Sequence, residues 1–456
     1  MIHDLFFAGF IGALFTLALR QPFLFVLAYI YIDLVAPQHL TYALLDPVPL
    51  SLISFVLAVL GWLIFDDKRH AVLGPRQALI LALVVYCALT LQDADFPADA
   101  WRKWDWVWKA LVFAMFLPLT LTSRLRIEAA AVVLVLSASV IIVPAGIKTL
   151  ASGGGYGSLR LLLDTNTGLY ESSILSCAAI ATIPIALFLM RTGTIFPPDW
   201  RVRLFCGALC FACLLIPVGT EARTGLICLG ALVFSLLRFV RHRMVWLSAL
   251  SALTLAALPL LPQSFLNRMQ TITEAKADQS ASTRLAVWRW TLDYVALHPF
   301  GGGFEAYRGN SFRFEKAASS KWDPDAPRAA GADEPQIIVE KARAYHSSYF
   351  EMLGEQGWPG LTLWLLIHIT GLVRMERLFR RHRHEPLPQH RWIAGMALAL
   401  QQAHLVYLTG ALFVGIAFMP FALMLLALQI GLDGLAGRLA AARRRSAFAP
   451  MVPTKA

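Results

Sequence analysis

Charged residues are scarce in this 456-residue chain: Asp, Glu, Lys and Arg make up 15% of it, while hydrophobic residues make up 57%. Soluble globular proteins contain about 25% charged residues. The composition therefore excludes a soluble multidomain protein and indicates an integral membrane protein. The net charge of +11 does not predict nucleic-acid binding, because the basic residues fall in short clusters between long apolar runs and form no folded basic face.

Three further features are missing. The chain has only six cysteines, all inside apolar runs, which excludes a disulfide framework in the longest polar segment. The N-terminus lacks a basic start, and its first apolar run leads directly into a second one after Arg20, so no cleavable signal peptide is expected. The sequence shows no internal repeat or matched pair of interrupted helices, which argues against an alternating-access transporter.

Long apolar runs are what the chain does contain, and a helix needs about 20 mainly apolar residues to cross a bilayer. We expect an all-α polytopic membrane protein with about 12 transmembrane helices (12–13), the first two being short enough to form a shallow hairpin. The candidate segments are 5–19, 22–36, 50–65, 78–91, 107–121, 129–147, 168–190, 204–218, 225–240, 245–261, 349–373, 393–408 and 411–432.

Arginine and lysine collect in every second connection between these segments, and short cytoplasmic loops are the ones that keep such residues. The alternate connections are therefore expected on the far side of the membrane, where residues 263–348 form the one long loop. We divide the chain into N-terminal transmembrane helices (1–262), this large, partly helical loop (263–348), and C-terminal transmembrane helices with a basic cytoplasmic tail (349–456).

Polar residues on the far side are the candidates for function, because a charge near hydrocarbon costs at least a few kcal/mol. Arg160, Asp164 and Asn166 lie in one glycine-rich connection. Arg223 lies in a turn between two spans that is too short to reach far into solvent, and a local pair with Glu221 would also explain its position.

Arg284 follows several Ser and Thr residues that favour a helix N-cap. We expect it in the first turn of an amphipathic helix whose apolar stripe contains Leu285, Trp288, Leu292 and Val295. A cation gains nothing from the helix dipole at that end, whereas a bound phosphate would be attracted both by the helix N-terminus and by the guanidinium. A solvated arginine is the alternative interpretation.

His346 lies in the segment Arg-Ala-Tyr-His-Ser-Ser-Tyr, just before the chain returns to the membrane. Histidine is the side chain whose ordinary pKa suits proton abstraction near neutral pH. A structural histidine is the alternative. The sequence shows no cluster of His, Cys, Asp and Glu with metal-ligand spacing, so any catalysis is expected to be metal-free.

Several motifs together resemble those of the O-antigen ligase and O-antigen polymerase superfamily. They are the residues from Arg284 through Trp288, the run His-Pro-Phe-Gly-Gly-Gly-Phe at 298–304, the run His-Ser-Ser-Tyr-Phe-Glu at 346–351, and Gly-Glu-Gln-Gly-Trp-Pro-Gly-Leu at 354–361. Residues 17–23, 100–104 and 262–272 resemble the branch of putative O-glycosylation ligases found with exosortase systems. The chain departs from that pattern at Asp-Thr-Asn (164–166) and at Glu-Ala-Arg (221–223).

The resemblance implies a glycosyltransferase of GT-C type in the bacterial inner membrane, with its site open to the periplasm and no metal or other cofactor. The implied donor is a glycan on undecaprenyl diphosphate, and the implied acceptor is a hydroxyl group of lipid A–core. His346 would be the catalytic base. Arginines at 223, 284 and 160 would bind the donor diphosphate, and Asp164, Asn166, Glu221 and Tyr345 would support them.

Three alternatives stay open at this point. A polymerase would use the same donor with a second lipid-linked glycan as acceptor, and a protein O-glycosylation ligase would use serine or threonine. A lipid-glycan transporter is a more remote reading, in which the polar residues would line a path through the membrane.

Overall fold

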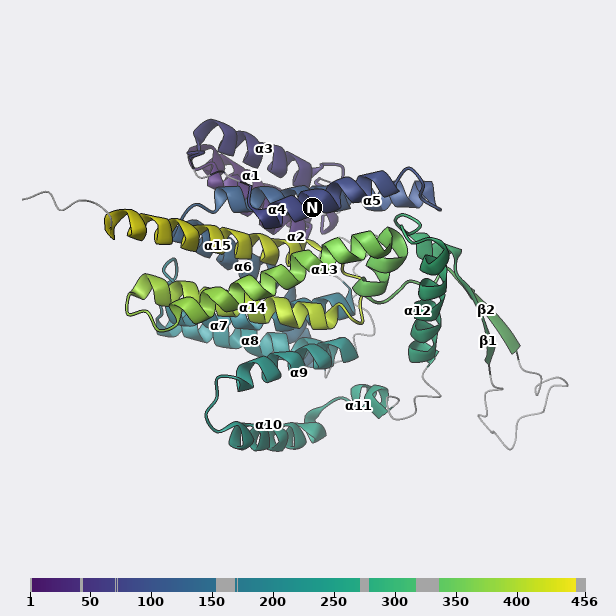
Figure 1. The fold of residues 1–456 in the computed structure, drawn as a ribbon. Coiled ribbons are helices and arrows are strands. Elements are labelled where there is room, and N and C mark those ends of the chain that lie inside the picture. The colour runs from purple at the N-terminus through teal and green to yellow at the C-terminus, as the bar shows by residue number, and fades with distance from the viewer. Residues whose placement is uncertain are drawn as a thin grey trace, which may run out of the picture.

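The computed structural model describes residues 2–41, 44–69, 71, 73–152, 169, 171–270, 279–316 and 336–447. Within these ranges the chain is almost entirely helical, and most helices lie side by side in one bundle (Figure 1). The all-α expectation is confirmed, apart from one short β-hairpin in the long loop.

The first half of the chain contains only helices in its described part. These are α1 (Ile2–Arg20), α2 (Phe23–Val35), α3 (Leu50–Phe65), α4 (Pro75–Thr90), α5 (Pro97–Thr120), α6 (Arg124–Ser152), α7 (Ser172–Thr192), α8 (Trp200–Gly219), α9 (Arg223–Leu237) and α10 (Arg243–Ala257).

The long loop and the C-terminal part follow. They contain α11 (Gln263–Gln270), α12 (Gln279–Leu297), the short 3-10 helix η3 (Ala306–Gly309), the antiparallel strands β1 (Ser311–Lys316) and β2 (Gln336–Lys341), α13 (Ser348–His382), α14 (Pro388–Gly410) and α15 (Pro420–Ala447).

Four helices in the described residues are long and apolar enough, by length and composition, to cross a membrane: Arg124–Ala151, Ser172–Thr192, Trp200–Gly219 and Pro420–Arg444. Of the most apolar stretch of α7, 83% is buried inside the protein, against 39% for α8. Helix α7 is therefore central, whereas α8 exposes much of its surface. The count of about 12 spans stays a prediction.

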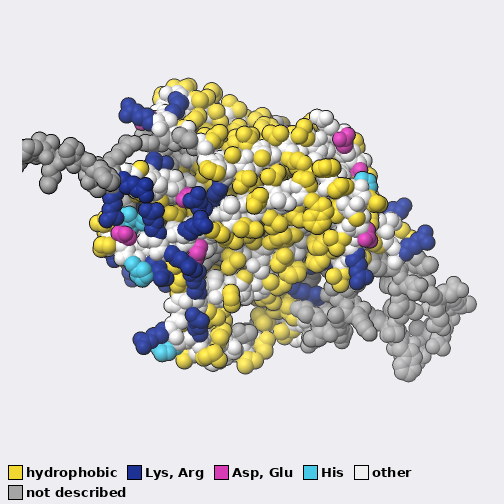
Figure 2. All heavy atoms as spheres, viewed as in Figure 1, with side chains coloured by type: hydrophobic (Ala, Val, Ile, Leu, Met, Phe, Trp, Pro, Cys, Tyr) yellow, Lys and Arg dark blue, Asp and Glu magenta, His cyan; other side chains and the backbone are white. Residues whose placement is uncertain are grey.

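The surface of the bundle fits a lipid environment. Large apolar side chains stand exposed on several helices, with Phe65 68% and Phe234 77% exposed. Figure 2 shows a broad hydrophobic band, with most Lys and Arg of the visible face gathered at one end and fewer at the other. Exposed apolar surface on this scale is unusual for a soluble protein, so the chain is a multi-pass membrane protein.

The ends of the helices separate into a basic end and an opposite end. The basic end includes the ion pairs Arg238–Glu376 and Arg126–Asp66, which join α9 to α13 and α6 to the end of α3. At the opposite end α12 stands across the bundle and the β1–β2 hairpin projects from it (Figure 1). Helices α5, α9 and α13 begin at this opposite end.

The start of the last expected span, residues 411–432, was predicted wrongly, because α15 begins only at Pro420. A proline suits the first position of a helix, since its missing N–H is not needed there. Residues 411–419 instead turn back over the start of α13: Ser348 N donates to Ala411 O at 2.8 Å, and Ile416 N donates to Ser348 Oγ at 2.8 Å.

Candidate active site

Helix α13 is broken near its start by Gly357, which has φ 63° and ψ −166°. A side chain there would clash with the carbonyl of Pro299, so only glycine allows the chain after α12 to enter the break. Trp358 N donates to Pro299 O at 3.0 Å, and Gly302 N donates to Gly354 O at 3.1 Å. The glycine run at 301–303 is therefore packed against the break in α13.

Helix α12 contains Arg284, but in a different place from the one expected. The helix begins at Gln279, so Arg284 lies in its second turn and not in its first. Several successive Ser and Thr residues can each cap a helix or continue it, and the sequence does not show which one it starts from.

The apolar stripe expected on α12 is also wrong in part. Leu285 and Leu292 are exposed, whereas Val287, Thr291 and Val295 are buried. These three buried residues lie four apart and share one helix face. The face that packs on the protein is thus rotated relative to the one predicted from hydrophobicity alone.

Trp288 fixes α12 to the start of α13. Its ring stacks on Phe350 with centroids 4.8 Å apart, and its Nε1 donates to Tyr345 O at 2.9 Å. Arg284 lies one helical turn before Trp288, and this docking brings its charge close to His346. Arg284 and His346, which the sequence analysis singled out separately, are thus brought close together where α12 packs on the start of α13.

His346 is exposed and adopts a left-handed backbone conformation, with φ 47°. Surrounding protein partly desolvates its imidazole, and the positive charges of Arg284 and Arg343 add to this effect; together they lower the pKa of His346 below 6.5. At neutral pH the ring is thus uncharged and can accept a proton, as a general base must.

Arg343 is held beside His346 by its backbone. Asn310, itself buried, donates from Nδ2 to Arg343 O at 2.7 Å and accepts from Arg343 N at 2.9 Å. The Arg343 guanidinium pairs with Glu340 on β2. Arg343 was not among the residues singled out from the sequence, because the strand pair that places it was not predicted.

Tyr345 is buried beside His346, with its ring over Gly354 and edge-on to Tyr307 at 5.6 Å. Burial and then the charge of Glu355 raise the pKa of the Tyr345 hydroxyl, which stays protonated. Among the described residues this hydroxyl has no hydrogen-bond partner. Tyr345 therefore supports the segment that contains His346 chiefly by packing.

Arg223 and Glu221 occupy the tight turn between α8 and α9. Glu221 is mostly buried with φ 51°, and Arg223 is the partly buried first residue of α9. The turn is fixed to α7, because Thr220 Oγ1 lies 2.8 Å from Ser176 Oγ. It lies at the same end of the bundle as the start of α13. Arg160, Asp164 and Asn166 lie outside the described residues.

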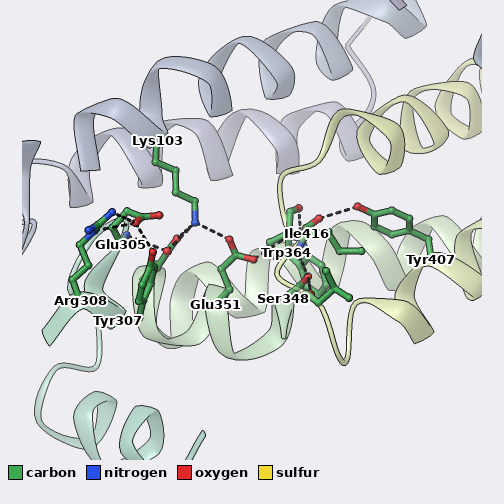
Figure 3. A network of polar contacts seen from close by, with 12 residues as sticks. Lys103, Glu305, Tyr307, Arg308, Ser348, Glu351, Trp364, Tyr407 and Ile416 are labelled. Carbon is green, nitrogen blue, oxygen red and sulfur yellow. Dashed lines mark hydrogen bonds and ion pairs between the residues drawn. The ribbon is translucent and has the colours of Figure 1, made fainter. Parts of the chain in front are cut away.

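A buried charge network lies next to this region and was missed by sequence reasoning (Figure 3). Lys103 Nζ on α5 donates to Glu351 Oε1 at 2.6 Å and to Glu355 Oε1 at 2.8 Å, both on α13. The Glu355 side chain is fully buried, and those of Lys103 and Glu351 are about nine-tenths buried. The spacing of the two glutamates, four residues apart on one helix face, was the available signal.

Glu305 extends the network to the long loop. Its backbone N donates to Glu355 Oε1 at 3.0 Å, and its carboxylate accepts from Tyr307 Oη at 2.8 Å and from Arg308 Nε at 3.1 Å. The network thus joins α5, the loop after α12 and the first turns of α13. Its geometry is suited to holding the loop after α12 against α5 and α13.

Among the described residues, no group of three or more His, Cys, Asp or Glu side chains is placed to hold a metal ion. The glutamates near His346 are already bound by Lys103 and Arg308. Metal independence of the reaction stays a prediction.

Two family models match the chain. Residues 2–194 match a family of unknown function, DUF5935, and residues 208–365 match the family described as O-Antigen ligase. No curated protein matches it. Lys103 comes from the first matched region and its glutamate partners come from the second.

The O-antigen ligase match runs from α8 into α13. It contains the Arg223 turn, the helix with Arg284, and His346 at the start of α13. Arg223, Arg284 and His346 thus all lie in the matched region, and residues 208–365 contain an O-antigen ligase family domain.

Proposed function

We propose that the protein is an O-antigen ligase of the bacterial inner membrane. It would transfer a polysaccharide from undecaprenyl diphosphate to a hydroxyl group of lipid A–core oligosaccharide. The family match supports chemistry of the ligase or polymerase type. The observation that carries the proposal is the exposed His346, with its lowered pKa, beside the charges of Arg284 and Arg343.

The proposed reaction is a direct displacement. His346 takes the proton of the acceptor hydroxyl, the acceptor oxygen bonds to the anomeric carbon, and the bond from that carbon to the diphosphate oxygen breaks, with inversion at the sugar. Diphosphate is a good leaving group, so the protein mainly positions the reactants and stabilises the departing charge. Arginines suit this task, because a guanidinium matches phosphate oxygens in a fork.

In this proposal Arg284, Arg223 and Arg160 bind the diphosphate, and no metal is required. Tyr345 supports the segment that contains His346, and Glu221 supports the Arg223 turn. Asp164 and Asn166 would act with Arg160 in the connection before α7. The diphosphate would thus lie between the α8–α9 turn and α12.

The proposed topology is a GT-C-type fold of about 12 spans. Short cytoplasmic loops retain Arg and Lys, so the basic end of the bundle would face the cytoplasm. The end with His346, α12 and the β-hairpin would then face the periplasm, where the donor glycan is presented.

Lipopolysaccharide gel profiling of a deletion strain tests the function. Loss of a ligase leaves bare core and leaves polymer on the lipid carrier. Loss of a polymerase leaves core with one repeat unit, which would replace the ligase proposal by the polymerase alternative. An unchanged lipopolysaccharide profile with loss of glycan from proteins would favour the protein O-glycosylation ligase.

A further inference from the structure

A polar cavity lies at the basic end of the bundle, away from His346. Its volume is about 210 Å³, and it lies between the start of α4, the end of α5, α13 and α15. Its charged lining residues are Arg76, Arg374, Arg438 and Asp433, and its apolar lining includes Pro118, Leu119 and Ile430. A water needs only about 10–15 Å³ of such space, so the cavity has room for a larger group.

Arg76 is the most informative residue of this cavity. Only 6% of its surface is exposed, and its Nη2 donates to Gln429 Oε1 at 3.0 Å. Its Nε and Nη1 are buried and have no hydrogen-bond acceptor among the described residues. Buried charged donors are almost always satisfied, so these two donors favour a further acceptor in the cavity.

The other charges of the cavity leave it positive. Arg374 Nε lies 3.7 Å from Asp433 Oδ2, the one acidic group in the lining that the structure describes. Arg438 Nη2 donates to Thr122 O at 3.0 Å, a neutral carbonyl that does not cancel its charge. Three guanidinium groups thus face one carboxylate.

The start of α4 adds to the positive potential. Gly74 and Pro75, at the N-terminus of this 16-residue helix, line the cavity together with Arg76. The N-terminal end of a helix dipole favours an anion. The helix end, the unsatisfied donors of Arg76 and the excess of arginine therefore all favour a negatively charged ligand.

We propose that this cavity binds a phosphate group, carried either by an anionic phospholipid of the adjacent leaflet or by free phosphate. Phosphate presents oxygens in several directions and accepts from more than one guanidinium at once. The apolar lining beside the arginines suits the first methylene groups of a lipid's acyl chains. Basic pockets between transmembrane helices on the cytoplasmic side are suited to lipid headgroups.

Binding to the purified full-length protein tests the proposal. The probes are phosphatidylglycerol in mixed micelles, phosphatidylcholine in the same micelles, and inorganic phosphate, with binding read from the rise in thermal unfolding temperature. We expect phosphatidylglycerol or inorganic phosphate to raise it and phosphatidylcholine not to. A response to phosphatidylglycerol alone identifies a lipid headgroup, and a response to inorganic phosphate identifies the free anion.

Two variants and one control make the test specific. Arg374→Gln and Arg438→Gln each remove a cavity charge without disturbing the buried Arg76–Gln429 pair, and each should weaken binding by about tenfold or more. Arg69→Gln is the control: it removes one positive charge at the basic end, but from a side chain that is 86% exposed and does not line the cavity. It should leave binding unchanged. Equal weakening by Arg69→Gln, or no response of the wild type to either phosphate probe, would overturn the proposal.

Discussion

The Lys103 network offers a sharp test of how the active-site end is held together. Lys103→Met keeps the length of the side chain but removes the ammonium that binds Glu351 and Glu355 at 2.6 and 2.8 Å. Glu355 is fully buried, so its carboxylate would lose its cation without gaining water. Removing one partner of a buried ion pair costs about 3–5 kcal/mol, and we expect a loss of unfolding free energy in that range.

Arg102→Met is the matched control, on the adjacent residue of the same helix. Arg102 is 74% exposed and pairs with Asp99 at 3.0 Å, and exposed pairs contribute about 0–1 kcal/mol. The assay is equilibrium unfolding in mixed detergent micelles. Adding Glu355→Gln to Lys103→Met should recover part of the loss, because the buried carboxylate without a cation is gone. A loss from Lys103→Met no larger than that from Arg102→Met would refute the reasoning.

Three further changes have defined outcomes. Arg343→Gln removes a positive charge that lowers the pKa of His346, so this pKa should rise and the acid limb of the pH–rate profile should move to higher pH. The control Arg313→Gln on β1 should not move the acid limb. An unmoved limb in Arg343→Gln would contradict the assignment of His346 as the base. Gly357→Ala forces a side chain into the break of α13 and should cost about 3 kcal/mol in unfolding experiments, whereas Gly207→Ala, with open space around it, should not destabilise. Trp288→Phe keeps a ring against Phe350 but loses the hydrogen bond to Tyr345 O. We expect the free energy of unfolding to fall by about 1 kcal/mol and glycan transfer to slow. An unchanged stability and an unchanged transfer rate would show that this hydrogen bond does not position His346.

The helices could be predicted from the sequence because each needs only a local apolar run. The start of α15 could not, since residues 411–419 are as apolar as a span and their turn is set by hydrogen bonds to Ser348. The buried face of α12 was predicted only in part, because tertiary packing buries Val287 and Thr291 and leaves Leu285 and Leu292 exposed.

The candidate site was predictable only where its parts are close in sequence or resemble a known motif. His346 and Arg284 are such parts, and the structure places the charge of Arg284 close to the His346 imidazole. Lys103 is separated from Glu351 by 248 residues, and no local pattern joins them. Arg343 depended on a strand pair that a largely helical sequence did not indicate.

Transfer by the purified protein is the most direct test of the central claim, that His346 is the base of a glycosyltransferase. The assay supplies lipid-linked glycan donor and lipid A–core acceptor in detergent, without any gradient, so product formation by the wild type excludes a transporter. His346→Ala should abolish transfer while folding and donor binding are retained, and His298→Ala, a change at another exposed histidine, should leave transfer intact. Near-normal transfer by His346→Ala would contradict the account.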